Sequence, residues 1–359
     1  MAAESSEHTA TDAALEGDLD YQNAALQEVS RTFALTIPQL PDDLRVVVGN
    51  AYLLCRIADT IEDSTALSVE QKRHCSEMFV DAVAGGTPPE AFAAALCPLL
   101  DASSTPAEKD LIANSTRVLR LTSRFSEEDR AALTRCVRIM AEGMERFQEG
   151  RFTHGLRDGE QLDAYCYHVA GVVGEMLTQL FCAHSKAIAV HREELTALAV
   201  SFGQGLQMTN ILKDVWDDKM RGVCWLPRST FEEQGFDLDG LSEERHGKAF
   251  ENGLARLISD ARGHLEDALR YTLTIPRSEE GIRRFCLWAI GMAVLTLRKI
   301  NRHRDFTSGT EVKISRRSVY ATVVVTRIVG RNNTLLRWIF GLLAAGLPHG
   351  ASESGPSTA

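Results

Sequence analysis

The chain has 359 residues, of which 44% are hydrophobic and 25% charged, the composition of an ordinary soluble globular protein. Its formal net charge of −10 argues against a nucleic-acid partner. The eight cysteines include no C-x-x-C motif, and the ten histidines include no H-x-x-x-H pair with a third ligand nearby. We therefore expect reduced thiols, a cytoplasmic location and no zinc site.

Both ends of the chain are polar. Residues 1–20 are acidic and contain no apolar stretch, so we expect a disordered tail and no signal peptide there. Residues 348–359 predict a second disordered tail. No Pro/Gly/Ser-rich linker divides the interior, so we expect residues 21–347 to form one domain.

The spacing of apolar residues predicts helices along almost the whole interior. Pro41-Asp42-Asp43 opens a helix through Asp63, Ser68-Val69-Glu70-Gln71 is a capping box that starts the next, and Ser126 begins one that ends near Glu149. Further helices are predicted near residues 160–184, 192–220, 242–273, 278–303, 311–329 and 332–346. Strand-like alternation is nearly absent and no repeat period appears, so the predicted fold class is all-α, a single large helical bundle with a central cavity.

The first informative motif is an acidic run at residues 56–63. Asp59, Glu62 and Asp63 are three and four residues apart, so they project from one side of the predicted helix. Arg56 lies one turn before Asp59, and apolar residues surround the run. Carboxylates in such surroundings need partners or a metal ion.

A second acidic run lies at residues 210–218. Asp214 and Asp218 share a helix face, and Lys213 is adjacent to the first of them. Carboxylate oxygens suit Mg²⁺ that also holds a substrate phosphate, and basic neighbours suit the phosphate oxygens. The two runs together therefore predict a diphosphate-handling site built from two helices. The alternative reading of either run alone is a solvated helix face.

Two further features bear on the cavity and the surface. Gly171 and Gly174 are costly inside a helix by about 1 kcal/mol each, so they indicate a bend or a close approach of a ligand to the backbone. Near the C-terminus, residues 335–347 are apolar apart from Arg337 but too short to span a bilayer. This segment predicts either a helix at the membrane interface or an ordinary core helix.

Four segments occur together in one order: SRTF at 30–33, YLLCRIADTIED at 52–63, YCYHVAGVVG at 165–174 and QMTNILKDVWDD at 207–218. In motif, order and spacing the chain resembles the squalene/phytoene synthase family over roughly residues 25–330. The resemblance implies the trans-isoprenoid synthase fold. It also implies the head-to-head joining of two molecules of farnesyl diphosphate.

Two later segments resemble squalene synthases within that family. They are FCLWAIGMAVLTL at 285–297 and EVKISRR at 311–317, which the resemblance associates with the reductive second step and with NADPH. Ser315 departs from the family pattern, which usually has a basic residue there. A non-reductive dehydrosqualene or phytoene synthase is the nearest alternative. A class-I terpene cyclase and a non-enzymatic helical scaffold are more distant alternatives.

The resemblance implies a role for each matching residue. The expected catalytic residues are Tyr165, Asp59, Asp63, Asp214 and Asp218, with Tyr165 relaying the proton lost when the cyclopropane of presqualene diphosphate closes. The expected Mg²⁺ ligands are Asp59, Glu62, Asp63, Asp214 and Asp218. The expected substrate-binding residues are Ser30, Arg31, Phe33, Tyr52, Arg56, Gln207, Asn210, Lys213, Arg221, Leu177, Met208 and Phe285. The expected NADPH-binding residues are Lys313, Arg316 and Arg317. We expect a monomer with a peripheral membrane contact through its C-terminal helix.

Overall fold

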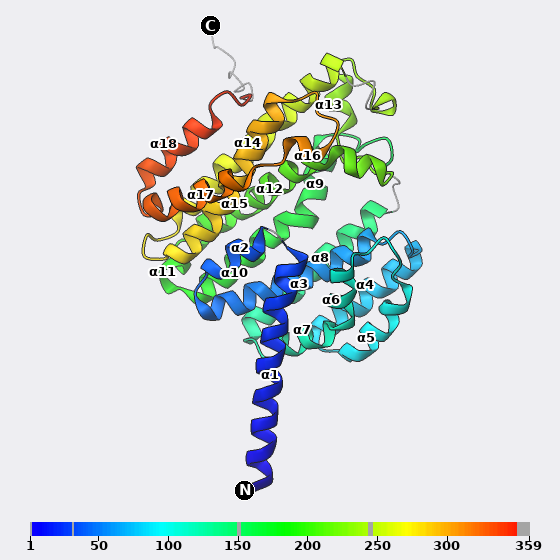
Figure 1. Cartoon of the computed structure of the whole chain (residues 1–359), viewed down its shortest axis with the longest axis vertical. Coiled ribbons are helices and arrows are strands. Elements are labelled where there is room, and N and C mark those ends of the chain that lie inside the picture. Colours follow the sequence, from blue (N-terminus) through cyan, green and yellow to red (C-terminus); the bar gives the residue numbers. More distant parts are fainter. Residues whose placement is uncertain (1, 31, 149–151, 243–246, 350–359) are drawn as a thin grey trace. The chain divides into compact units, whose positions relative to one another are not determined.

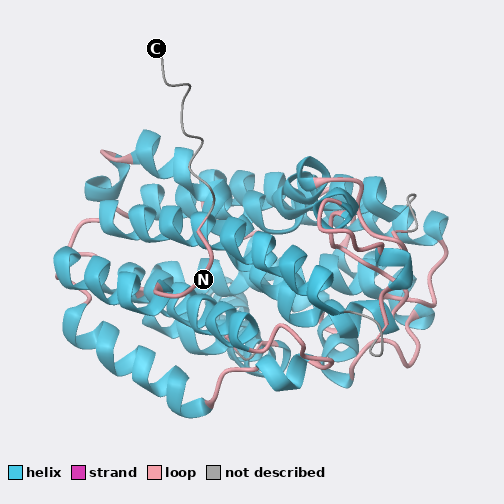
Figure 2. Cartoon of the chain, turned by 90° about the horizontal axis from the view of Figure 1, so that it is seen from above, coloured by secondary structure: helices cyan, strands magenta, loops and turns pink. Residues whose placement is uncertain are grey.

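The computed structural model describes residues 2–30, 32–148, 152–242 and 247–349, with side chains described from residue 14 onward. Helices and loops make up the described residues, which contain no strand, as Figure 2 shows. The all-α prediction is thereby confirmed. The helices group into two compact units, residues 1–149 with 176–190 and residues 150–175 with 191–359. No linker in the sequence marks this division.

The first unit is built on three helices: α1 (Ala2–Val29), α3 (Asp42–Asp63) and α8 (Glu127–Gln148). Around them lie the shorter helices of the unit, several of which are visible side by side in Figure 1: α2 (Phe33–Thr36), η1 (Ile37–Gln39), α4 (Val69–Ala84), α5 (Pro89–Leu96), η2 (Cys97–Leu99), α6 (Pro106–Ala113), α7 (Ser115–Thr122) and α11 (Lys186–Ala189). Helix α10 (Val172–His184) begins in the second unit and ends in the first.

A buried polar network fixes how α1, α3 and α7 pack. Asn50 of α3 donates to Gln22 of α1 at 3.1 Å and to the Val118 carbonyl of α7 at 2.9 Å. Thr122 donates back to the Asn50 side-chain oxygen at 2.8 Å. Because buried polar groups are costly unless bonded, these hydrogen bonds allow one relative placement of the three helices.

Helix α1 extends into the segment for which we expected a disordered tail. Asp18 of α1 is buried and accepts hydrogen bonds from Arg117 at 3.0 Å and from Arg120 at 2.7 Å, both on α7. The prediction of disorder is therefore wrong for the segment around Asp18. Composition suggested a tail because the segment is polar, whereas the two arginines that hold it lie about 100 residues away.

The second unit is organised around α12 (Arg192–Met220), α14 (Gly247–Thr274) and α15 (Glu280–Arg302), which pack against one another. In Figure 1 they run side by side in green, yellow and orange. The remaining helices of the unit are α9 (Gly159–Cys166), η3 (Tyr167–Gly171), α13 (Arg228–Glu232), η4 (Leu238–Gly240), α16 (Gly309–Val312), α17 (Arg316–Val329) and α18 (Asn333–Ala344).

Most predicted helix positions agree with the structure. Helices α3 and α12 have the predicted bounds, and Ser68 forms its capping box, in which Gln71 donates its backbone N–H to the serine hydroxyl at 3.3 Å. The continuous helix predicted for 311–329 is wrong. The chain leaves the helical conformation at Lys313 and starts again after Ser315, whose hydroxyl accepts from the Ser318 N–H at 3.1 Å. A serine at that place is a helix start.

Three further features concern the C-terminal tail, the cysteines and membrane-spanning helices. The predicted C-terminal tail falls largely in residues 350–359, which lie outside the described part of the chain. None of the eight cysteines forms a disulfide. Over the described ranges, no helix combines the length and the apolar character needed to cross a bilayer.

Candidate functional site

The acidic run of the first unit lies at the C-terminal end of α3. Asp59 and Glu62 are half-buried and Asp63 is exposed. Burial raises the pKa of Asp59 to about 7, and the charge of Asp63 adds to this effect. Acids are unfavourable at the negative end of a helix, and the last turn of α3 contains no basic residue. A carboxylate so costly to ionise would be stabilised by a bound cation.

Arg56 lies beside this run and is shared with another helix. It forms an ion pair with Glu108 of α6, whose carboxylate also accepts the Thr105 backbone N–H at 2.7 Å. The Nε atom of Arg56 is buried and has no hydrogen-bond partner among the described residues. An unsatisfied buried donor costs about 1–3 kcal/mol, so Arg56 is suited to receive an oxygen from a ligand. Glu108 lies on a different helix from Arg56, so the local sequence gave no signal of this pair.

The predicted residues at the start of the chain gather near the middle of α3. Ser30 is buried and accepts the Phe33 backbone N–H at 2.9 Å. The rings of Phe33 and Tyr52 lie 5.1 Å apart, and the Tyr52 hydroxyl donates to the Val29 carbonyl at 3.3 Å. Burial raises the pKa of Tyr52. Arg31, also predicted to bind substrate, lies outside the described residues.

A lysine that the sequence analysis missed joins the acidic end of α3 to α4. Lys72 donates to the carbonyl of Glu62. Burial lowers the pKa of Lys72, while Glu62 and Asp63 act to raise it. Its position ten residues after Glu62, on a different helix, gave no local signal of this contact.

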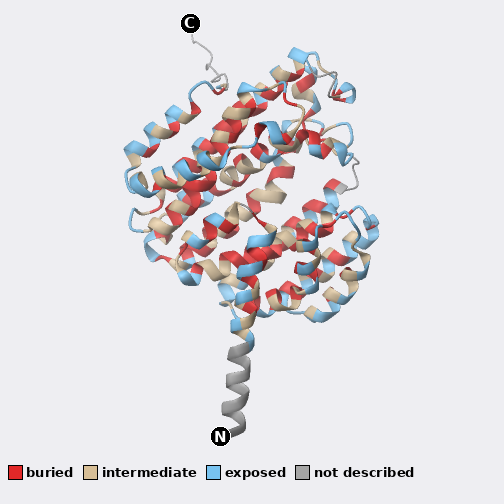
Figure 3. Cartoon of the chain, viewed as in Figure 1, coloured by how far each residue is buried: buried red, intermediate tan, exposed pale blue. Residues whose placement is uncertain are grey.

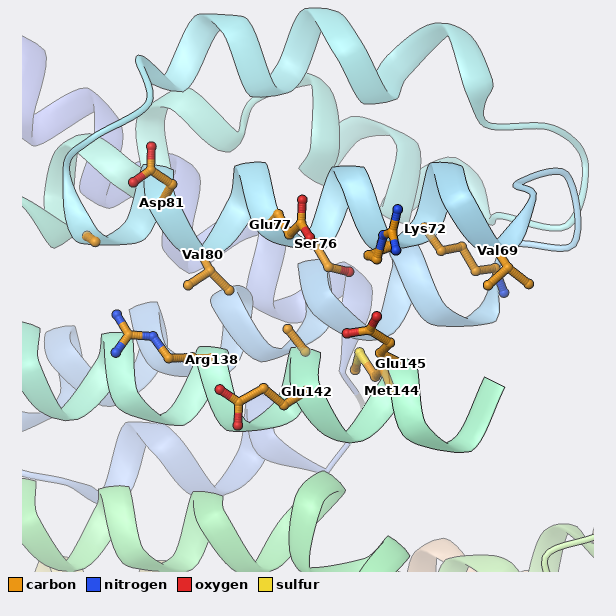
Figure 4. Close-up of a pocket in the computed structure, with 13 residues that line it drawn as sticks. Val69, Lys72, Ser76, Glu77, Val80, Asp81, Arg138, Glu142, Met144 and Glu145 are labelled. Atoms are coloured by element: carbon orange, nitrogen blue, oxygen red, sulfur yellow. The ribbon is translucent and has the colours of Figure 1, made fainter. Parts of the chain in front are cut away.

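A groove of about 300 Å³ lies between α4 and α8 (Figure 4). Lys72, which donates to the Glu62 carbonyl, is one of its lining residues. In Figure 4, residues of α4 face residues of α8 across the groove. Its charged lining residues are of both signs: Lys72, Arg73 and Arg138 against Glu77, Asp81, Glu142 and Glu145. Such a mixed lining selects no single class of charged ligand, and none of the predicted site residues contributes to it.

The acidic run of the second unit lies in the last turns of α12. Lys213 pairs with Asp214 at 3.1 Å and donates to Asn210 at 3.2 Å. Asp218 is buried and pairs with Arg221 just beyond the helix. The predicted basic residues are thus in contact with the predicted carboxylates, and the whole cluster comes from a single helix terminus.

A third segment, which the sequence analysis missed, packs on this acidic turn. Trp216 donates its indole N–H to the Phe306 carbonyl at 2.7 Å. A Cβ atom at Gly309 would lie 3.0 Å from the Lys213 carbonyl and 3.6 Å from an Asp214 carboxylate oxygen. Glycine therefore allows α16 to approach the acidic turn closely. A side chain at position 309 would crowd the Lys213 carbonyl and the Asp217 carboxylate, whose nearer oxygen would lie 3.3 Å from the Cβ.

Tyr165 lies at the end of α9 and is buried against an aromatic partner. Its ring stacks on Trp225 with 3.9 Å between centroids and 11° between planes. Trp225 belongs to the loop after α12, which pairs with the segment before α9: the Cys224 N–H donates to the Phe152 carbonyl at 2.8 Å, and the Leu156 N–H donates to the Leu226 carbonyl at 2.9 Å. The sequence analysis did not identify Trp225.

The glycines near Tyr165 have a structural explanation. Residues 167–171 form a π-helical turn, a feature that often accompanies a kink in a helix. A Cβ at Gly174 would lie 2.1 Å from the Ala199 carbonyl, and one at Gly203 would lie 2.1 Å from the Ala170 carbonyl. The sequence predicted a bend or the close approach of a ligand, whereas the structure shows the close approach of α12 to this segment. π-helical turns are frequent at functional sites, which agrees with a functional site near Tyr165.

The predicted NADPH residues lie at the start of α17. Lys313 follows α16, and Arg316 and Arg317 occupy the first turn of α17 after its Ser315 cap; all three are exposed. The N-terminal end of a helix carries partial positive charge and unpaired N–H groups, which suit a phosphate. The basic side chains strengthen this preference.

The apolar residues predicted to bind substrate are buried to different degrees. Met208 and Phe285 belong to the core of the second unit, whereas Leu177 and Phe33 of the first unit are half-buried. The polar Gln207, also predicted to bind substrate, is half-buried in the second unit. The packing of the apolar residues is equally that of ordinary core residues. The central cavity therefore stays a prediction.

Comparison with known proteins places the chain in a family. The model of squalene/phytoene synthases matches residues 26–318. The chain belongs to this family. The matched range contains both acidic runs, the segment around Tyr165 and the Gly309 turn.

Curated relatives are squalene synthases of fungi and plants. The chain is 29% identical to squalene synthase ERG9 of Gibberella zeae over 286 residues, which cover 78% of this chain and 58% of the relative. It is 28% identical to squalene synthase 1 of Arabidopsis thaliana, covering 83% of this chain and 68% of the relative. Against the first three relatives, the matched region spans 58–62% of their length.

Solved structures show the same fold. The complex of TcSQS with the ligand BPH1237 has a TM-score of 0.76 at 24% identity and covers 94% of both chains. A dehydrosqualene synthase in complex with a ligand has a TM-score of 0.63 at 20% identity, covering 88% of this chain and 98% of that one. The chain therefore has the isoprenoid synthase fold of these proteins.

Proposed function

We propose that this protein is a squalene synthase, which joins two molecules of farnesyl diphosphate into presqualene diphosphate and then reduces that intermediate to squalene. The observation that carries the proposal is a cation beside the carboxylates of both acidic runs, in a chain whose curated relatives are named squalene synthases. Lys213 pairs with Asp214 on α12, and Arg56, one turn before Asp59 on α3, pairs with Glu108 of α6. Loss of diphosphate requires its developing charge to be stabilised, and each run offers the groups for that.

The residues present fit Mg²⁺ at both runs. No group of three or more metal-binding side chains is preformed within the described ranges. Mg²⁺ nevertheless needs few protein ligands, because water and substrate phosphate complete its shell. Asp59, Glu62 and Asp63 would hold it on α3, and Asp214 and Asp218 on α12. Bound Mg²⁺ would neutralise charge on the departing diphosphate.

Basic and polar side chains beside the carboxylates would hold the diphosphate oxygens. Arg56 offers its buried Nε donor. The other proposed contacts are Ser30, Arg31, Tyr52, Asn210, Lys213, Gln207 and Arg221. Phe33, Leu177, Met208 and Phe285 would contact the prenyl chains and exclude water, which lengthens the lifetime of an allylic cation.

Tyr165 would accept and pass on the proton lost when the cyclopropane closes. Its buried position keeps bulk water from the reacting carbons, and its stack on Trp225 fixes the plane of its ring. The aromatic faces would also favour nearby positive charge. The departing diphosphate would be the final proton acceptor.

The N-terminal end of α17 fits the phosphates of NADPH. Lys313, Arg316 and Arg317 are exposed there at the N-terminal end of a 14-residue helix. NADPH bound there would supply the hydride of the second step. Ser315 stands where the family usually has a basic residue, and its hydroxyl caps the helix by accepting the Ser318 N–H at 3.1 Å.

The proposal extends to where the protein works. We infer a cytoplasmic monomer that meets a membrane through its C-terminal helix, since its substrate and product carry long apolar chains. The eight cysteines are free thiols, which agrees with a reducing compartment such as the cytoplasm.

Product identification tests the function directly. The protein is incubated with farnesyl diphosphate and Mg²⁺, with and without NADPH, and the products are extracted and identified. Squalene should form only with NADPH, and presqualene diphosphate should accumulate without it. If the same hydrocarbon forms with and without NADPH, the protein is a dehydrosqualene synthase instead. If no product forms, the proposal is wrong.

A further inference from the structure

Exposed apolar side chains collect on the last two helices. Ten large hydrophobic residues are exposed within the described ranges, and six of them lie on α17 and α18. We call these six the α17–α18 face: Tyr320, Val325, Ile328, Leu335, Trp338 and Leu342. Ile328 is 78% exposed and Trp338 63%, values that a packed side chain would not have. Concentrated exposure of this kind marks an interaction surface.

Helical spacing makes each half of this face continuous. Leu335, Trp338 and Leu342 are three and four residues apart and so project from one side of α18, while Leu336 and Phe340 on the other side are buried. In Figure 3 the exposed positions of α17 and α18 follow the outer edges of these helices. Both helices pack against α15 with their inner sides, so their outer sides are available.

The face is held in place by hydrogen bonds. The buried guanidinium of Arg283 on α15 donates to the Gly330 carbonyl at 2.9 Å and to the Asn333 side chain at 2.7 Å, at the turn between α17 and α18. At the far end of α18, Asn301 donates to the Gly346 carbonyl at 2.9 Å. These hydrogen bonds hold both ends of α18, so the exposed side chains lie on a surface that is fixed in place.

The charge of this region has the opposite sign to the rest of the chain. Residues 312–349 contain six basic and no acidic side chains. Three of the six are the proposed NADPH residues and Arg331 pairs with Glu280 at 3.1 Å, so Arg327 and Arg337 are the two left for lipid headgroups. The whole chain has a net charge of −10, so the remainder carries −16. Basic residues next to exposed Trp, Tyr and aliphatic side chains are the combination that binds the headgroups and upper acyl region of an anionic bilayer.

We propose that the α17–α18 face docks the protein on an anionic lipid surface. A second copy of the chain fits less well, because a two-fold interface would place this basic region against itself. The inference specifies the membrane contact of the proposed function: it names two helices instead of one and an anionic lipid class. It does not depend on the condensation chemistry.

Vesicle sedimentation of the full chain tests the docking. Phosphatidylcholine vesicles with and without phosphatidylglycerol are compared at low and high salt. Binding should require phosphatidylglycerol and should weaken with salt. Arg337→Gln should weaken binding about fivefold, which corresponds to about 1 kcal/mol for one arginine near the surface. Trp338→Ser and Ile328→Ser should weaken it about tenfold each.

Matched controls are Arg130→Gln, an exposed arginine on α8, and Val190→Ser, an exposed aliphatic residue of the first unit. Both should bind as the unchanged protein does, and thermal unfolding should show that every variant is folded. Equal binding to both vesicle types, no binding, or binding unchanged in the face variants would each overturn the proposal. So would a concentration-dependent dimer that Trp338→Ser abolishes. Turnover of detergent-dispersed farnesyl diphosphate by the face variants separates failure of docking from failure of the proposed activity.

Discussion

Tyr165 and Trp225 stack with their ring centroids 3.9 Å apart and their planes 11° apart. The two residues are 60 positions apart in the sequence and meet because the loop after α12 pairs with the segment before α9. This stack links the expected proton-handling residue to the chain that directly follows the second acidic run. Its loss should therefore affect chemistry as well as packing.

Substitution at the stack should separate chemistry from positioning. Tyr165→Phe keeps the ring and removes the hydroxyl, so presqualene diphosphate formation should fall about 10²–10⁴-fold. Trp225→Leu should lower kcat with little change in KM for farnesyl diphosphate, and Trp225→Phe should recover part of the loss. Single-turnover kinetics of the first step measure both effects. Near-normal turnover of Tyr165→Phe would return this tyrosine to a core role.

The carboxylates of both acidic runs should be needed for metal-dependent turnover. Asp59→Asn and Asp214→Asn should each lower kcat about 10²–10³-fold, because charge on the departing diphosphate loses a stabilising group. Circular dichroism should show an unchanged helix content. Asp239→Asn, which alters an exposed acid elsewhere, is the control. Normal activity of either variant at limiting Mg²⁺ would remove that residue from the metal site.

The cofactor residues should act on the second step alone. Lys313→Gln and Arg316→Gln should each raise KM for NADPH about 10–100-fold, because a charge-assisted hydrogen bond to phosphate is worth about 1.5–3 kcal/mol. Presqualene diphosphate should still form and should accumulate. Arg302→Gln, an exposed arginine on α15, should leave KM unchanged. Equal changes in both half-reactions would argue against this assignment.

Arg283 should contribute strongly to the stability of the second unit. Its side chain donates to the carbonyls of Thr272 at 2.9 Å and Ile275 at 2.7 Å in addition to its contacts at the α17–α18 turn. Arg283→Met should lower the free energy of unfolding by about 2–5 kcal/mol, since it leaves buried carbonyls without donors. Arg284→Met, next in sequence but paired with Glu280 at the surface, should cost about 1 kcal/mol or less. Denaturant titrations compare the two variants.

The ion pairs of Asp18 should make stability depend on pH. Hydrogen bonds from Arg120, more than those from Arg117, hold the pKa of Asp18 below its ordinary value of 3.8. The stabilisation is therefore fully present above pH 3.8 and is lost as the pH falls toward the lower native pKa. Asp18→Asn should be less stable than the unchanged protein by about 1.5–3 kcal/mol at pH 7. This difference should shrink below pH 3.8, and a difference independent of pH would contradict the assignment.

Several features could be predicted from the sequence because they depend on neighbouring residues. The helical periodicity predicted the bounds of α3 and α12, and the serine capping box predicted the start of α4. Residues three and four apart meet on a helix whatever surrounds it. The same spacing accounts for the contacts of Lys213 with Asn210 and of Arg221 with Asp218, although neither contact was predicted.

Other features depended on residues that are distant in the chain. The partner of Arg56 is Glu108, Lys72 reaches the Glu62 carbonyl, and Gly309 lets α16 approach Asp214. Asp18 is helical and buried because Arg117 and Arg120 neutralise it, although its local composition indicated disorder. Local sequence determined which helices form and which charges share a helix face. Only the tertiary structure decided which of those charges are buried and paired, because burial and pairing depend on the residues that other helices bring near.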